Sequence, residues 1–109
     1  MDFHTKFTNL KPDERIKNLV QKKIGSLDRF LDKASVVHAW VEVGKTTEHH
    51  KEGRVWYAEC QLKMPGKKSF RATATCEDLA TAIDEVKEEL YLLLKKEKEK
   101  RINNLKRKP

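Results

Sequence analysis

Apolar and polar residues alternate in four segments of the chain, and each alternation predicts a β-strand. The first segment places Phe3 and Phe7 on one side, which is typical of a strand with one buried face. A Pro65-Gly66 turn signal lies between the last two segments, so we expect these to pair as a hairpin. The four predicted strands are residues 2–8, 35–44, 54–64 and 69–75.

Two further segments repeat apolar residues every three or four positions, which predicts amphipathic helices. Pro12 opens the first helix, because its fixed φ suits the first turn, and the apolar stripe runs about five turns to Leu31. The second helix begins near Asp78, and its stripe thins after Leu94. We expect the helix to outrun its core and fray beyond that point.

The predicted element order is β-α-β-β-β-α, which indicates an α+β fold. The connection through a helix allows the first two strands to be parallel, and the later strands form an antiparallel meander. Both apolar helix stripes then share one face of a four-stranded sheet, giving a two-layer sandwich. We expect residues 1–94 to form a single domain and residues 95–109 to form a basic helical extension and tail.

Composition excludes several classes of protein. The 109 residues contain no apolar run near the ~18 residues of a membrane span, and residues 1–4 do not resemble a secretory signal. Cys60 and Cys76 are too few and too far apart in sequence for a disulfide scaffold. We therefore expect a cytoplasmic protein with no membrane association.

Positive charge is concentrated in two segments. The formal net charge is +7, and residues 95–109 carry eight basic residues against two acidic ones, a net +6. Residues 63–71 carry four basic residues and no acid, whereas residues 77–89 carry six acids and one lysine. A basic segment is the first requirement of a nucleic-acid-binding surface, but it equally fits a solvated tail.

No catalytic constellation is present in the sequence. His49 and His50 are adjacent in a polar loop, and neighbouring side chains of an extended segment point apart, so they do not supply the convergent ligands of a metal site. Cys60 shares a strand face with Trp56 and Leu62, which favours a buried structural thiol. We therefore expect no enzyme activity, no metal or other cofactor and no small-molecule substrate.

Four aromatic residues are candidates for stacking on RNA bases. The chain lacks the glycine- and aromatic-rich pattern of base-stacking motifs, so we expect Trp40 and Trp56 to pack in the core or on the sheet. If RNA is bound, phosphate and shape contacts should dominate. The four candidates are Trp40, Trp56, Tyr57 and Tyr91.

The second helix carries a family resemblance. The run Asp78-Leu79-x-x-Ala82-Ile83-Asp84, followed by Leu90, Leu94 and Lys96-x-Lys98-x-Lys100, resembles the closing helix of the ribosome hibernation-promoting factors, also called ribosome-associated inhibitors or subunit interface proteins. The opening strand, the segment Ile24-x-x-Leu27-Asp28-Arg29-Phe30 and the element order are similar too, over about residues 2–101. The chain ends at Pro109 without the second domain of long members, so we expect a short form.

The resemblance implies a function. Members of this family bind the small ribosomal subunit in the channel for messenger and transfer RNA and inhibit translation during stress or in stationary phase. The expected partner is therefore the small subunit and its rRNA, and we expect a monomer away from the ribosome. By position, the phosphate contacts would be Lys23, Arg29, Lys96, Lys98 and Lys100.

The chain departs from the family at two positions. Glu89 and Leu92 occupy helix positions where relatives commonly carry Lys or Arg, and an acid facing rRNA phosphate would be repelled. Other basic residues can compensate in the predicted hairpin and the tail, and these are Lys67, Lys68, Arg71 and Arg101.

Two other binding functions remain open. A double-stranded-RNA-binding module has a similar α-β-β-β-α part, but it needs basic residues at the start of its last helix, where this chain has Glu77 and Asp78. A protein-interaction domain acting through the C-terminal helix is favoured by the continuous apolar run 90–94, which exceeds one core-facing stripe.

Overall fold

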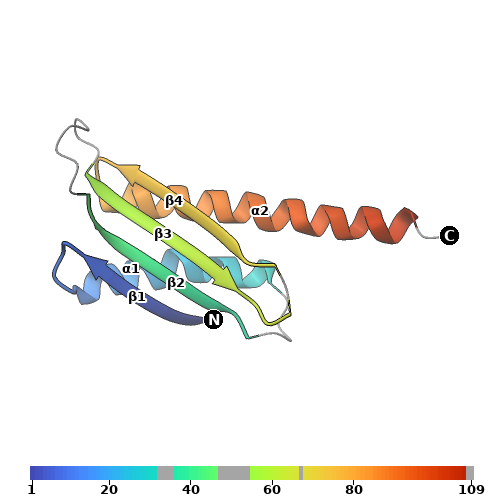
Figure 1. Ribbon diagram of the computed structural model, residues 1–109, viewed down its shortest axis with the longest axis horizontal. Helices are drawn as coiled ribbons and strands as arrows, with labels where there is room; N and C mark the ends of the chain where they lie inside the picture. Colours follow the sequence, from blue (N-terminus) through green and yellow to red (C-terminus); the bar gives the residue numbers. More distant parts are fainter. Residues whose placement is uncertain (32–35, 47–54, 67, 108–109) are drawn as a thin grey trace.

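The computed structural model describes residues 1–31, 36–46, 55–66 and 68–107, with side chains described as far as residue 100. The polar loop that contains His49 and His50 lies outside the described residues. Figure 1 shows the arrangement of the elements. They are β1 (Asp2–Thr8), α1 (Glu14–Gly25), the 3₁₀ helix η1 (Ser26–Phe30), β2 (His38–Lys45), β3 (Trp56–Lys63), β4 (Phe70–Cys76) and α2 (Leu79–Arg107).

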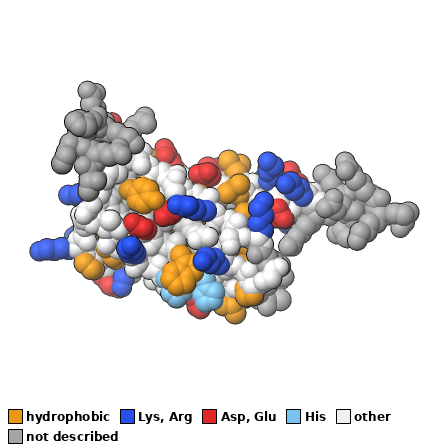
Figure 2. Space-filling view, viewed as in Figure 1, with side chains coloured by type: hydrophobic (Ala, Val, Ile, Leu, Met, Phe, Trp, Pro, Cys, Tyr) orange, Lys and Arg blue, Asp and Glu red, His pale blue; other side chains and the backbone are white. Residues whose placement is uncertain are grey.

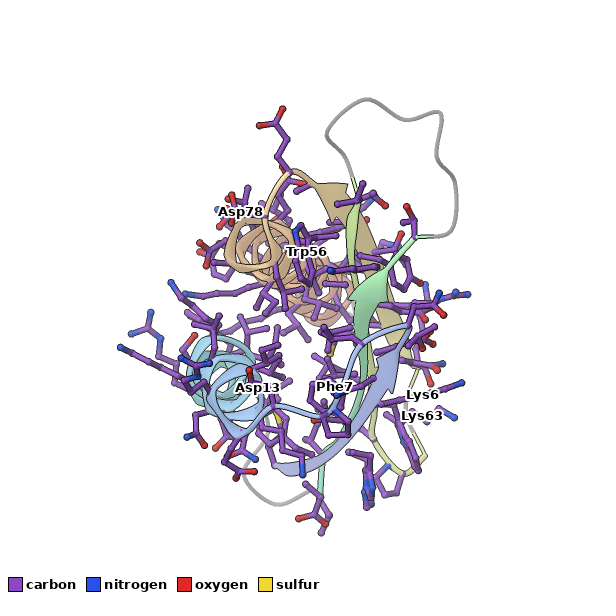
Figure 3. All side chains as sticks on the ribbon, turned by 90° about the vertical axis from the view of Figure 1, so that its left-hand side faces the viewer. Lys6, Phe7, Asp13, Trp56, Lys63 and Asp78 are labelled. Carbon is purple, nitrogen blue, oxygen red and sulfur yellow. The ribbon has the colours of Figure 1, made fainter. Side chains whose placement is uncertain are left out.

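The sheet has the strand order β1-β2-β3-β4. Strands β1 and β2 are parallel, and the pairs β2–β3 and β3–β4 are antiparallel. Both helices cover the same face of the sheet and leave the other face open (Figures 1 and 3). The predicted α+β sandwich with β-α-β-β-β-α order is therefore confirmed.

The core lies between the sheet and the two helices, because each element contributes one apolar face to it. Alternate strand positions point into this layer, so Val41, Cys60 and Leu62 are buried while their neighbours in sequence are not. No polar or charged residue is buried within the described parts of the chain. The helical residues buried there are Val20, Ile24, Leu27, Ala82, Ile83, Val86, Leu90 and Leu94.

The first helix begins two residues later than predicted, at Glu14 rather than at Pro12. Asp13 is its N-cap: the residue is extended, and its carboxylate accepts a hydrogen bond of 2.8 Å from the backbone N–H of Arg15. Such a cap satisfies one of the amides that have no partner inside the helix, so Pro12 precedes the helix rather than opening it. After Gly25 the chain tightens into η1, which continues the apolar stripe and buries Leu27.

The second helix is continuous beyond its core. Asp78 precedes it and accepts hydrogen bonds from the Thr81 backbone N–H at 2.8 Å and the Thr81 hydroxyl at 2.7 Å, and these bonds lower the pKa of Asp78. The helix outruns the sheet, as predicted (Figure 1). The expected fraying after Leu94 is wrong, because α2 is helical to Arg107, and its Lys- and Glu-rich end consists largely of good helix formers.

The Cys60 thiol is fully buried, as predicted. Burial, with a smaller effect of the Glu59 carboxylate, raises its pKa from about 9 to about 12. The folded state therefore keeps a proton that the unfolded state releases. We expect the free energy of unfolding to fall between about pH 9 and 12 by up to about 1.4 kcal/mol per pH unit. Urea unfolding of the wild type and of Cys60→Ala at several pH values tests this, since equal slopes would contradict it.

Candidate nucleic-acid interface

Basic side chains from three elements gather at one end of the domain. The helices run back along the sheet, so η1, the β3–β4 turn and the second half of α2 lie at the same end, from which α2 projects (Figure 1). Blue side chains cluster on this projecting part of α2 (Figure 2). We call this region the basic end and define it by six exposed residues, which are Arg29, Lys68, Lys95, Lys96, Lys98 and Lys100.

The basic residues of α2 lie on more than one side of the helix. Lys96 and Lys100 are one turn apart and continue the line of Leu92, whose side chain is 54% exposed. Lys98 lies on the opposite side of the helix from Lys96 by helical spacing. The exposed residue Glu89 stands one turn before Leu92. Glu89 and Leu92, where the family resemblance predicts Lys or Arg, therefore border the stripe that carries Lys96 and Lys100.

Arg29 is joined to α2 through two aromatic rings. Its guanidinium lies 4.8 Å from the centroid of the Phe30 ring, and Phe30 meets Tyr91 edge-on with 5.1 Å between ring centroids. Tyr91 lies one turn before Lys95 and two turns before Lys98 on the same side of α2. Arg29 therefore contributes positive charge next to the basic half of α2, although the two are distant in sequence.

Lys23 does not belong to the basic end. Its ammonium pairs with the Asp84 carboxylate of α2 at 3.0 Å, and both side chains are partly exposed. The pair links the two helices across the surface of the domain. Because a carboxylate already compensates this charge, Lys23 offers less to a phosphate than the lysines of α2.

The hairpin residues of the predicted site are divided between two surfaces. Lys68 is exposed in the turn before β4, whereas Arg71 lies on the open face of the sheet and forms an ion pair with Glu59. Lys67 lies outside the described residues. Arg101 is part of α2, but its side chain is not described.

The open face of the sheet carries an aromatic group that sequence reasoning assigned to packing. Trp40 stacks on His4 with 4.0 Å between ring centroids and 14° between ring planes, and its side chain is still 47% exposed. The alternation in β2 does place Trp40 on the polar side with His38 and Glu42, which was a usable signal. The position of His4 depends on the β1–β2 register and had no such signal.

The described residues show no arrangement for metal binding or membrane insertion. No group of three or more His, Cys, Asp or Glu side chains in this part of the chain could hold a metal ion. No helix in the described part of the chain combines the length and apolar character of a membrane span. The described surface therefore offers positive charge, together with the exposed aromatic side chains of Trp40 and Phe30.

Comparison with known proteins places the chain in a family. Residues 3–102 match the family described as sigma 54 modulation protein / S30EA ribosomal protein. The chain belongs to this family. The family resemblance inferred from the helix motif is thereby confirmed.

One curated relative matches most of the chain in sequence. A protein of Lactococcus lactis subsp. cremoris (strain MG1363) named ribosome hibernation promotion factor is 29% identical over 97 residues. This alignment covers 88% of the present chain and 49% of that protein, so the chain spans about half the length of this curated relative.

Solved structures show the same fold. The N-terminal domain of Protein Y from Thermus thermophilus superposes with a TM-score of 0.72 at 27% identity, covering 88% of this chain and 98% of that one. A ribosomal subunit interface protein from Coxiella burnetii gives a TM-score of 0.69 at 16% identity, covering 90% and 98% of the two chains. At this identity the second similarity establishes the fold alone.

Proposed function

We propose that this protein is a ribosome hibernation factor, which binds the small ribosomal subunit in the channel for messenger and transfer RNA and inhibits translation in stress or stationary phase. It acts by occupying this RNA-lined space, with no bond chemistry and no cofactor. A cytoplasmic location and a monomeric state away from the ribosome are parts of the same proposal. Family membership and the printed name of the Lactococcus relative support it.

The basic end is the observation that carries the proposal. Six exposed Lys and Arg side chains from three elements converge there, and a polyanion binds such a surface through its phosphates without any reading of base sequence. The two-layer fold gives these charges a rigid base, and α2 projects its lysines beyond the sheet. A projecting basic helix can enter an RNA-lined cleft that the whole domain then fills.

The acidic first half of α2 argues against a double-stranded-RNA-binding module. Such a module requires basic residues where its last helix begins, and α2 instead begins after Glu77 and Asp78. Asp84, Glu85 and Glu88 continue the exposed acidic surface along the helix. We therefore place the phosphate contacts at the basic end and not at the start of α2.

Co-sedimentation with separated ribosomal subunits tests this function. We expect retention on the small subunit at 50 mM salt and a loss of affinity of about 100-fold at 200 mM, as for about four neutralised phosphates. Prior binding of messenger and initiator transfer RNA should abolish retention, because these ligands fill the same channel. Retention on the large subunit alone, or on neither subunit at either salt concentration, would contradict the proposal.

A further inference from the structure

The open face of the sheet presents three stacked rings. Trp40 and His4 are neighbours in the parallel register of β1 and β2. The His4 ring also lies 5.5 Å from that of His38 at an angle of 29°, and His4 Nε2 is 3.3 Å from His38 Nδ1. We call His4, His38 and Trp40 the ring platform. No helix covers it, because α1 and α2 both pack on the opposite face (Figure 3).

Trp40 does not belong to the hydrophobic core. The core beneath it is formed by the other side of β2, where Ala39 and Val41 are buried. An indole that is 47% exposed leaves apolar ring surface in water, and burying such surface against a partner is favourable by the hydrophobic effect. The contact with His4 holds the indole in place before any partner arrives, which reduces the entropy lost on binding.

Cations border the ring platform. The Lys63 ammonium lies 5.9 Å from the centroid of the Trp40 ring, and Lys6 lines a hollow of about 370 Å³ beside Trp40. Lys6 and Lys63 both project on the side of the sheet away from the helices (Figure 3). Among the described residues, neither lysine forms an ion pair with a carboxylate. Both are therefore available to an anionic group.

Polar groups in the same hollow can meet the edge of a ring-shaped ligand. Gln61 lies opposite Trp40 in the β2–β3 register and lines the hollow together with Glu59. Glu59 is engaged by Arg71, and Glu42, which also lines the hollow, accepts a hydrogen bond of 2.7 Å from the Thr8 hydroxyl. The Gln61 amide supplies both a donor and an acceptor. This site combines an aromatic ring, polar side chains and lysines. It therefore matches a flat ligand that has a polar edge and an attached anionic group.

We propose that the ring platform stacks an unpaired nucleobase of single-stranded RNA, with Lys63 and Lys6 contacting the adjoining phosphates. Aromatic side chains on an open sheet face are a general means of holding unpaired bases, and each stacked base contributes substantially to affinity. The platform lies near the basic end, since Lys63 ends β3 immediately before the turn that carries Lys68. One strand of RNA can therefore contact both. The proposal shares with the proposed function only the choice of RNA as partner.

Tryptophan fluorescence gives a direct test with the full chain. The protein contains two tryptophans, so Trp56→Phe leaves Trp40 as the sole reporter. Titration with a single-stranded RNA hexamer at 50 mM salt should quench Trp40 emission in a saturable manner. The hexamer paired with its complement should not quench it, because its bases are already stacked.

Affinity measurements with matched variants complete the test. Trp40→Ala should weaken hexamer binding about 5- to 100-fold, Trp40→Phe should retain most of the affinity, and Trp56→Phe on the helix side of the sheet should match the wild type. Circular dichroism shows whether Trp40→Ala remains folded.

Two outcomes would overturn the proposal. One is unchanged Trp40 emission at hexamer concentrations at which an anisotropy measurement shows that binding is saturated, and the other is the absence of hexamer binding. If the hexamer does not quench Trp40 emission but the protein is retained on the small subunit, this proposal alone is overturned. If the hexamer quenches Trp40 emission but the protein is not retained on the small subunit, only the proposed function is overturned.

Discussion

Replacing Lys96, Lys98 and Lys100 together by Ala should lower the affinity for the small ribosomal subunit by about two orders of magnitude near 0.1 M salt. Each lysine that neutralises a phosphate contributes about 0.7–0.9 to the slope of log K against log salt concentration. Removal of three should therefore reduce the slope by about 2–3. Alanine is a better helix former than lysine, so α2 itself should persist. Titration of labelled protein with small subunits at several salt concentrations measures both quantities.

A charge-retaining variant separates the effect of charge from that of shape. Replacement of the same three lysines by Arg keeps the positive charge and should preserve the salt slope within about one unit. If the alanine variant binds as tightly as the wild type, the lysines of α2 serve solubility and the basic end is not the ribosome-binding surface. If both variants lose affinity equally, the ammonium groups do more than neutralise phosphate.

Replacing Gly44 by Ala should destabilise the fold by about 3 kcal/mol or more. Gly44 is paired with Thr8 across β1 and β2, and a Cβ atom added at Gly44 would lie 2.0 Å from the Thr8 carbonyl oxygen and 2.9 Å from its carbonyl carbon. Both are backbone atoms, so no side-chain rotation relieves the clash and the end of β1 must separate from β2. This cost is at the upper end of measured overpacking. Urea unfolding measures it.

Gly25→Ala is the matched control. Gly25 ends α1 with helical backbone angles, and an added Cβ would meet only the Phe3 ring, at 3.7 Å and 4.0 Å. Because Ala restricts the unfolded chain more than Gly, we expect this variant to match the wild type or to be stabilised by up to about 1 kcal/mol. Equal destabilisation of the two variants would show that the close approach of β1 to Gly44 is not the cause.

The sequence alone predicted the elements and most of the fold. Alternation has a period of two and the helical stripes a period near 3.6, so each pattern is local and readable without knowledge of distant residues. The first two strands are connected through a helix, and the turn signal at Pro65-Gly66 joins the last two strands as a hairpin. Both features restricted the topology. Local signals also indicated the burial of Cys60 and the basic character of α2. The cap at Asp13 and the continuous end of α2 were missed, because helix ends depend on single hydrogen bonds and on propensity beyond the core.

Only the tertiary structure decided how the functional side chains combine. Lys23 looked like Lys96 in the sequence, but it meets Asp84, which lies 61 positions along the chain, and so it is partly neutralised. The stacking of Trp40 on His4 and the close approach of Thr8 to Gly44 both follow from the register of two parallel strands separated by a helix. A residue's own pattern reports whether its side chain faces the core, whereas its partner across the sheet depends on register. Long-range packing sets that register, and here it determines which charges and rings remain available to RNA.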